Sequence, residues 1–321
     1  FTQNSTTGGI FNINYVAGAT QVNFRNLLNL NSDNNTIFRS GTGNFSDAIL
    51  VKNTANMVSH NRLYNSILSV KQVVGANLFT VTASANYSNI MRKTPDYRIV
   101  SYTKSPDFDD YNLAMGDFFN SSSGRFTSGL DEKLFGGNLE ISKKIDLEKV
   151  KTTVKAGGFY QNRARDFHSR SFVYGGSVYT PTFDPATDLG QENVEAGRVY
   201  LVEKTSKELA NYNGKSLMNA GFLTADQKFF EKLRAVWGVR YEDMDIKVDN
   251  KSIGADIAEV RDHSILPSVN LSWGLTEKTN LRAAYYSSVN RPEFRELAPF
   301  AFYVFDKNAE IRGNQDLQVA K

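Results

Sequence analysis

Apolar and polar residues alternate with a period of two along much of this chain. In the clearest segment, 77–88, the apolar positions are Phe79, Val81, Ala83, Ala85 and Tyr87, and Thr, Ser or Asn residues separate them. Successive side chains of a β-strand point to opposite sides, so such a segment has one apolar and one polar face. The alternation therefore predicts an all-β chain.

The pattern predicts ten antiparallel strands, at 8–16, 20–30, 61–73, 77–88, 131–144, 149–162, 215–229, 233–248, 263–275 and 279–290. Long polar connections are predicted at 31–59, 89–130, 163–214 and 249–262, and the intervening short connections are predicted around 18–19, 74–76, 146–148, 230–232 and 276–278. Short and long connections thus alternate without a break, so each kind is expected at one end of the sheet.

Strand length favours a membrane β-barrel. A tilted transmembrane strand needs about 9–11 residues, whereas strands of soluble sandwiches average about 5–6. Short turns at one end and long loops at the other are typical of outer-membrane barrels, as are aromatic girdles at both interfaces. Phe79 and Tyr87 stand at opposite ends of one apolar stripe, and Trp237, Tyr241 and Trp273 share the apolar parity. The alternative is a large soluble antiparallel protein of lectin-like or propeller type.

Composition excludes several other classes. No run of about 18 apolar residues occurs, so helical membrane spans are not expected. The chain has no cysteine, which removes disulfides and thiolate chemistry. Its 37 basic and 34 acidic residues are interspersed, so no basic patch for nucleic acid is predicted.

The C-terminal third contains a run of motifs: LPSVNL at 266–271, LTEKTNLR at 275–282, SVNRPEFRELAPF at 288–300, FYVF at 302–305 and GNQDL at 313–317. This run resembles the barrel of TonB-dependent outer-membrane receptors, in the version typical of Bacteroidota. The resemblance implies a barrel of about 22 strands around an N-terminal plug. It also implies energised uptake of a scarce ligand such as a siderophore, cobalamin, glycan or peptide.

The resemblance further implies a location in the outer membrane of a Gram-negative bacterium. The implied partners are outer-membrane lipid, the plug of the same full-length chain, the TonB complex and possibly a surface lipoprotein. Neither a plug nor a TonB box is recognisable within 1–321, so the range is expected to be one segment of a single barrel domain. A passive porin or a scaffold subunit of an outer-membrane complex is the alternative function.

The densest charge cluster near a loop comprises Arg291, Glu293, Arg295 and Glu296. These residues are candidates for contact with a plug or a ligand. The competing interpretation, which is favoured here, is that alternating charges fix the start of a loop through ion pairs. Exposed pairs of this kind are common and individually weak.

Aromatic residues in the predicted long loops are candidate ligand contacts, because ring faces stack on sugars and aromatic groups. They are Tyr97, Tyr102, Phe108, Tyr111, Phe172, Tyr174 and Tyr179. Packing of the loops on one another is the favoured alternative. Carboxylates at Asp107, Asp109, Asp110, Asp184 and Asp188 lack EF-hand spacing, and ordinary loop solvation is preferred to calcium binding.

Catalytic signals are weak. The three histidines, His60, His168 and His263, have no partners at metal-ligand spacing, so no metal or cofactor is expected. Asp262 and His263 form the one adjacent acid–histidine pair, which an outer-membrane hydrolase would require near the barrel rim. The sequence therefore predicts a non-enzymatic protein.

Overall fold

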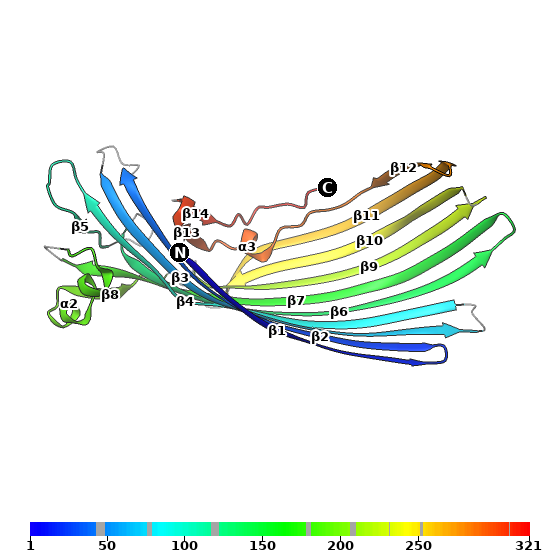
Figure 1. Cartoon of the computed structure of the whole chain (residues 1–321), viewed down its shortest axis with the longest axis horizontal. Helices are drawn as coiled ribbons and strands as arrows, with labels where there is room; N and C mark the ends of the chain where they lie inside the picture. Colours follow the sequence, from blue (N-terminus) through cyan, green and yellow to red (C-terminus); the bar gives the residue numbers. More distant parts are fainter. Residues whose placement is uncertain are drawn as a thin grey trace.

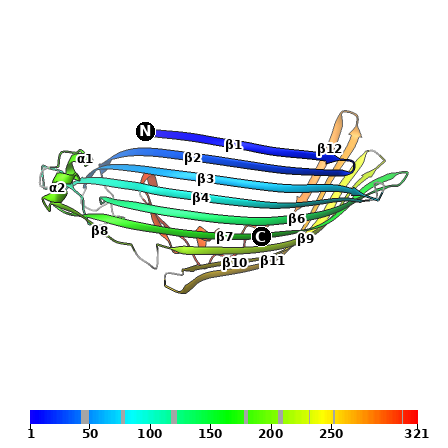
Figure 2. The ribbon, with the colours of Figure 1, turned by 90° about the horizontal axis from the view of Figure 1, so that it is seen from below.

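A computed structural model of the chain describes residues 1–42, 49–75, 79–116, 122–177, 181–205, 210–230, 232–250, 253–307 and 309–321. Its main element is a 12-stranded antiparallel sheet with the path β1-β2-β3-β4-β6-β7-β9-β10-β11-β12, to which β5 and β8 add at β4 and β7 (Figures 1 and 2). The strands on this path are β1 (Thr2–Ala17), β2 (Thr20–Thr42), β3 (Leu50–Val74), β4 (Phe79–Lys104), β6 (Gly124–Asp146), β7 (Val150–Gly176), β9 (Tyr212–Phe229), β10 (Leu233–Asn250), β11 (Ala255–Thr276) and β12 (Thr279–Tyr286).

The remaining elements are short. They are β5 (Asn112–Leu113), α1 (Pro185–Asp188), α2 (Gln191–Glu195), β8 (Val199–Glu203), α3 (Phe294–Leu297), β13 (Ala301–Val304), η1 (Phe305–Lys307) and β14 (Ala309–Arg312). None of the described helices is long and apolar enough to cross a membrane.

All ten predicted strands are present in the predicted order, but most are longer than predicted. Residues 77 and 78 of the predicted fourth strand lie outside the described residues, and β12 ends at Tyr286 rather than at residue 290. The predicted loops 31–59, 89–130, 163–214 and 249–262 are wrong over much of their length. For example, β4 and β7 continue for 26 and 27 residues. In these parts the strands remain paired with their neighbours, but neither face is consistently apolar, so the sequence shows no alternation of apolar and polar residues.

The convex face of the sheet carries the exposed apolar side chains that the alternation predicts to face lipid. On β10, Arg240 and Glu242 face the concave side, so Trp237, Val239 and Tyr241, which are 42–48% exposed, face outward. Aromatic side chains on the same outward face recur in neighbouring strands, about ten residues from the short connections. We call this set the upper girdle: Tyr64, Tyr87, Phe135, Tyr160 and Tyr241. Ring centroids are 6.3 Å apart for Tyr64–Tyr87 and 6.5 Å for Phe135–Tyr160.

A bulge in β4 separates its membrane part from its upper part. Pairing with β6 shifts between Thr94 and Tyr97, and pairing with β3 shifts at the same level. Pro95 lies in this bulge, where its missing N–H costs no ladder hydrogen bond. The extra residue reverses the parity, so that Phe79 to Tyr87 present their odd positions outward and Tyr97 and Ile99 point inward.

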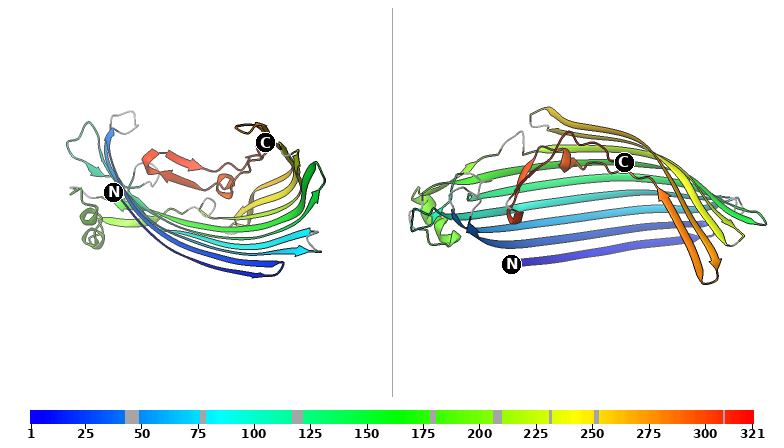
Figure 3. Two further views of the ribbon diagram at one scale, coloured as in Figure 1. Left: turned by 45° about the vertical axis from the view of Figure 1, so that its right-hand side comes forward. Right: turned by 90° about the horizontal axis from the view of Figure 1, so that it is seen from above.

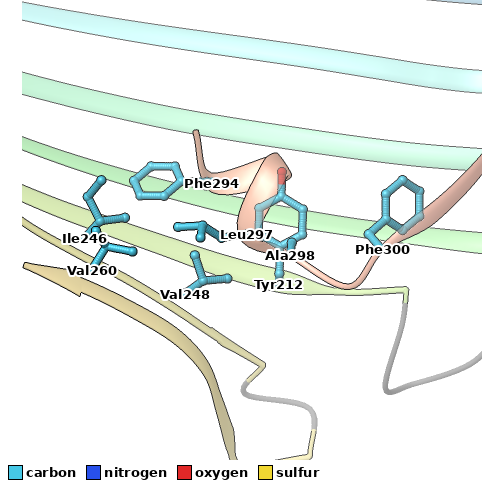
Figure 4. Packing of buried hydrophobic residues seen from close by; sticks show 8 residues of the cluster. All are labelled: Tyr212, Ile246, Val248, Val260, Phe294, Leu297, Ala298 and Phe300. Carbon is cyan, nitrogen blue, oxygen red and sulfur yellow. The ribbon is translucent and has the colours of Figure 1, made fainter. Parts of the chain in front are cut away.

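The chain after β12 folds back over the concave face (Figures 1 and 3). We call residues 287–321 the inner segment. Its Phe294, Leu297, Ala298 and Phe300 form a buried cluster with Tyr212, Ile246, Val248 and Val260 of β9, β10 and β11 (Figure 4). Further along, Tyr303 and Phe305 pack on Ala55, Ile99 and Val173. Burial of each large side chain contributes about 1.5–3 kcal/mol, so the inner segment is firmly seated.

The two ends of the main path, β1 and β12, are the edges of the described sheet. Every residue of both strands is exposed. An unpaired backbone group in hydrocarbon costs several kcal/mol, so both edges require pairing within a bilayer.

The two tryptophans of the chain provide a test of the lipid face. Trp237 and Trp273 are 47% and 50% exposed on the convex side, and Trp273 lies nearer a short connection. We expect brominated acyl chains to quench the fluorescence of both, with mid-chain bromine acting more strongly on Trp237. The variants Trp237→Phe and Trp273→Phe assign the two signals. Quenching by aqueous iodide but not by bromolipid would contradict a lipid-facing convex surface.

Candidate functional site

Ion pairs attach the inner segment to the concave wall. Arg291 is mostly buried and bonds Glu242 of β10 through Nη1 at 2.7 Å and Asp262 of β11 through Nη2 at 2.7 Å. Glu293 accepts from Arg163 of β7 at 2.8 Å, and Arg163 in turn pairs with Glu132. The wall residues that bond the inner segment directly, Glu242, Asp262 and Arg163, come from three separate strands, so these pairs fix the position of the segment across the sheet.

Close packing holds α3 against the wall in addition to the ion pairs. Glu293 and Glu296 form a reciprocal capping box, which satisfies backbone N–H groups at the start of the helix. The Phe294 ring lies 4.8 Å and 5.3 Å from the guanidinium carbons of Arg163 and Arg165. It also lies against Gly214, where an added Cβ would be only 2.5 Å from the ring. A glycine at this position of β9 is therefore required for the observed seating.

A cavity of about 550 Å³ lies between the inner segment and the wall. Its basic lining residues are Arg92, Arg165 and Arg295, and its aromatic lining includes Tyr97, Phe126, Phe167, Tyr212, Phe300, Tyr303 and Phe305. Guanidinium groups bind anionic oxygens in a forked geometry, and ring faces stack on planar groups. Asp306 also lines the cavity, and Arg165 pairs with Glu132 at 2.5 Å. Three arginines against one lining carboxylate leave a cavity suited to an anionic ligand with planar or apolar parts.

Tyr97 lies in the cavity wall, above the membrane-spanning part of β4. Burial raises its pKa to about 12, and the neighbouring Tyr303 phenol acts in the same direction. Tyr97 therefore keeps its proton at physiological pH and contributes a neutral ring and hydroxyl to the cavity.

A separate cap covers the upper ends of β4 and β7. In it, Tyr102 donates to the buried Asp188 at 2.7 Å, and Asp188 also accepts from Thr182. Tyr111 packs edge-on to Phe183 at 5.5 Å, and the Lys52 ammonium lies over both rings. Burial, then the bond to Asp188, raises the pKa of Tyr102. The Asp188 carboxylate thus accepts hydrogen bonds from protein groups, and the Asp184 side chain caps the N-terminus of α1.

The structure separates the predicted site residues into several groups. Arg295 and Tyr97 meet at the cavity, whereas Arg291, Glu293 and Glu296 hold the inner segment in place. The other predicted aromatics are not at the cavity. Tyr102 and Tyr111 belong to the cap, Tyr174 is buried on β7, Phe108 is 64% exposed, Phe172 lies near Arg170, and Tyr179 is outside the described residues.

Several cavity residues were not predicted, notably Arg92, Arg165, Phe167 and Tyr212. The pattern at Arg163, Arg165 and Phe167 has the period of two that marks one face of a strand. It was missed because the segment was interpreted as loop.

Comparison with known proteins gives the family context. Residues 168–320 match the model of the outer membrane protein β-barrel family. Among curated proteins, no sequence matches the chain. The family match confirms the predicted outer-membrane β-barrel, and the chain lies in the outer membrane of a Gram-negative bacterium.

Several solved structures are similar at low identity. The ferric citrate transporter FecA in its unliganded form is 12% identical with a TM-score of 0.39, over 88% of this chain and 43% of its own. The siderophore receptor PiuA from Acinetobacter baumannii is 11% identical with a TM-score of 0.39, over 98% and 52%. The ferric-catecholate import receptor Fiu from E. coli K12 is 13% identical with a TM-score of 0.37, over 90% and 49%. The chain thus spans about half the length of these proteins.

Loss of Arg291 is expected to release the inner segment. In Arg291→Gln, the buried carboxylates of Glu242 and Asp262 lose their shared cation and keep only Arg240 and Lys321, which costs about 3 kcal/mol, the low end for a broken buried pair. Hydrogen exchange of the α3 amides should accelerate roughly 100-fold. The control is Arg312→Gln on β14, whose exposed pair with Glu310 should change exchange little. Equal protection of α3 in both variants would show that the buried pairs do not hold the segment.

The raised pKa of Tyr102 predicts a cap that opens at high pH. A folded-state pKa above the unfolded value of about 10 gives stability that is present below pH 10 and lost as pH rises through the folded pKa. Proteolytic cleavage in residues 182–198 should therefore accelerate above pH 10. In Tyr102→Phe the cap should be less stable throughout and this pH dependence should flatten. An unchanged pH profile in Tyr102→Phe would assign the transition to another group.

Proposed function

We propose that this chain is part of the barrel wall of a TonB-dependent receptor that takes up a scarce ligand. The main support is that the motifs behind the resemblance form the concave site. The segment 288–300 forms α3 and its ion pairs, and 266–271 lies on β11 beside Asp262. Gly313 approaches the backbone oxygens at the end of α3, and Asn314 donates to Glu296 O at 2.6 Å.

In this proposal the cavity contributes to ligand binding on the side of the wall that faces the barrel interior. Arg92, Arg295 and the aromatic rings contact the ligand, and Arg291 and Glu293 hold their support in place. Further strands pair with β1 and β12 to complete a barrel of about 22 strands. A plug domain of the full-length chain lies in the interior and couples to the TonB complex, and a surface lipoprotein is a further candidate partner.

The ligand class is open among ferric siderophores, cobalamin, glycans and peptides, because similar folds serve different ligands. The guanidinium groups of the cavity favour a ligand that carries negative charge. A receptor needs a specific binding site for its ligand, whereas a passive porin needs only an open, hydrated channel.

Two measurements on the full-length protein distinguish a receptor from a porin. In planar bilayers, a plugged receptor should give no steady conductance, whereas a porin conducts. In cells, uptake of radiolabelled members of the ligand panel should saturate and should stop when a protonophore collapses the proton-motive force. Steady conductance with protonophore-insensitive uptake would support a porin instead.

The cavity itself is tested by charge removal. In Arg92→Gln/Arg295→Gln, binding of the transported panel member should weaken by about tenfold or more, because two charge-assisted contacts are lost. Arg312→Gln removes one arginine of the same inner segment from outside the cavity and should bind normally. Normal binding by the double variant would move the ligand site elsewhere in the barrel.

A further inference from the structure

A second hollow lies on the opposite, convex face of the sheet. It has a volume of about 450 Å³ and lies across β1 to β4. Its side chains form two adjacent rows of the ladder. One row is Leu30, Arg62 and Met91, and the next row is Ser32, His60 and Lys93.

The hollow faces the exterior of the barrel, not its interior. On β3 the odd positions reach the concave side, as Ala55 and Met57 show by lining the inner cavity. No register shift occurs between β2 and β3, so the even positions His60 and Arg62 point outward. Arg62 lies one outward position beyond Tyr64 of the upper girdle, and His60 lies one position further. These basic groups therefore lie where the apolar band ends and lipid headgroups begin.

No carboxylate pairs directly with the basic groups of the hollow, although Asp131 lies opposite Met91 in the same row. Arg62 donates to Asn89 Oδ1 at 2.8 Å and contacts the Met91 sulfur at 2.6 Å. Asn89 in turn donates to Asp131. Among the described residues, no carboxylate lies within 4 Å of the Arg62 or Lys93 nitrogens, and His60 bonds the hydroxyl of Ser32 at 2.9 Å.

The rim at β10 and β11 differs in this respect. There, Lys247 pairs with Asp256 at 3.1 Å, Arg261 lies 3.8 Å from Asp245, and His263 lies 3.0 Å from Asp243. Basic groups without a direct carboxylate partner are thus found at the membrane boundary on β3 and β4 but not at this other part of the same rim. Exposure to solvent at the rim is common to both places and therefore does not explain the difference between them.

We propose that the hollow binds the phosphorylated headgroup of an outer-leaflet glycolipid of the lipid A type. Arg62 and Lys93 supply charge-assisted hydrogen bonds to phosphate, and Ser32 and His60 supply further polar contacts. Leu30 and Met91 flank Arg62, and the Tyr64 and Tyr87 rings below it offer surface for acyl chains. Such a lipid matches both the charge above the boundary and the apolar stripe below it. The proposal depends on the outer-membrane location and is independent of transport.

The test is native mass spectrometry of the detergent-solubilised full-length protein titrated with purified diphosphoryl lipid A. The wild type should retain one lipid A at low lipid concentration. The variant Arg62→Gln/Lys93→Gln should bind about tenfold or more weakly, because two charge-assisted contacts are lost. The matched control, Lys247→Gln/Arg261→Gln, removes two charges from the compensated rim and should bind like the wild type. Heat-modifiable mobility on gels verifies that each variant is folded.

Two further arms identify the ligand chemistry. Lipid A freed of its phosphates should bind as weakly to the wild type as diphosphoryl lipid A binds to the double variant. Excess inorganic phosphate should displace little lipid, since it lacks the acyl chains. Equal binding by the double variant or by dephosphorylated lipid overturns the proposal. Complete displacement by inorganic phosphate also overturns it and assigns the hollow to a free anion.

Discussion

The cost of leaving a peptide group unpaired in hydrocarbon is the constraint on which this structure depends. Each N–H and C=O within the bilayer must find a partner on a neighbouring strand, since no water is available. The long antiparallel ladders from β1 to β12 meet this demand, and they fix the side-chain parity as a consequence. Once the parity is fixed, one face of every strand is committed to lipid and the other to the interior, where polar chemistry can be arranged.

Sequence patterns predicted the membrane part of the fold well, because lipid imposes a strong signal there. Trp237, Val239 and Tyr241 alternate with polar residues only because one face of β10 meets hydrocarbon. Above the membrane both faces meet water or protein, so apolar and polar residues do not alternate in the upper half of β7, although its ladder continues to Gly176. Strand order and turn positions were therefore predictable, whereas the upper strand ends were not.

The candidate site was only partly predictable for a related reason. The cluster from Arg291 to Glu296 is conspicuous in the sequence, but its partners Glu242, Asp262 and Arg163 come from distant strands. Neighbouring residues of this cluster also differ in what they do: Arg291 is mostly buried between two carboxylates, while Arg295 lines the cavity. Local sequence cannot distinguish the roles of Arg291 and Arg295. Each role depends on which wall residues lie opposite the arginine once α3 is packed against Gly214.

The bulge at Pro95 divides β4 into two halves in which opposite sets of positions face outward. Below it, odd-numbered side chains belong to the lipid surface, and above it they belong to the interior, so the parity of one half does not dictate that of the other. Deletion of one bulge residue would turn Tyr97 and Ile99 from the interior to the exterior and leave the span from Phe79 to Tyr87 in place. The face on which Tyr97 lies is thus set at the bulge, separately from the span from Phe79 to Tyr87 that faces lipid.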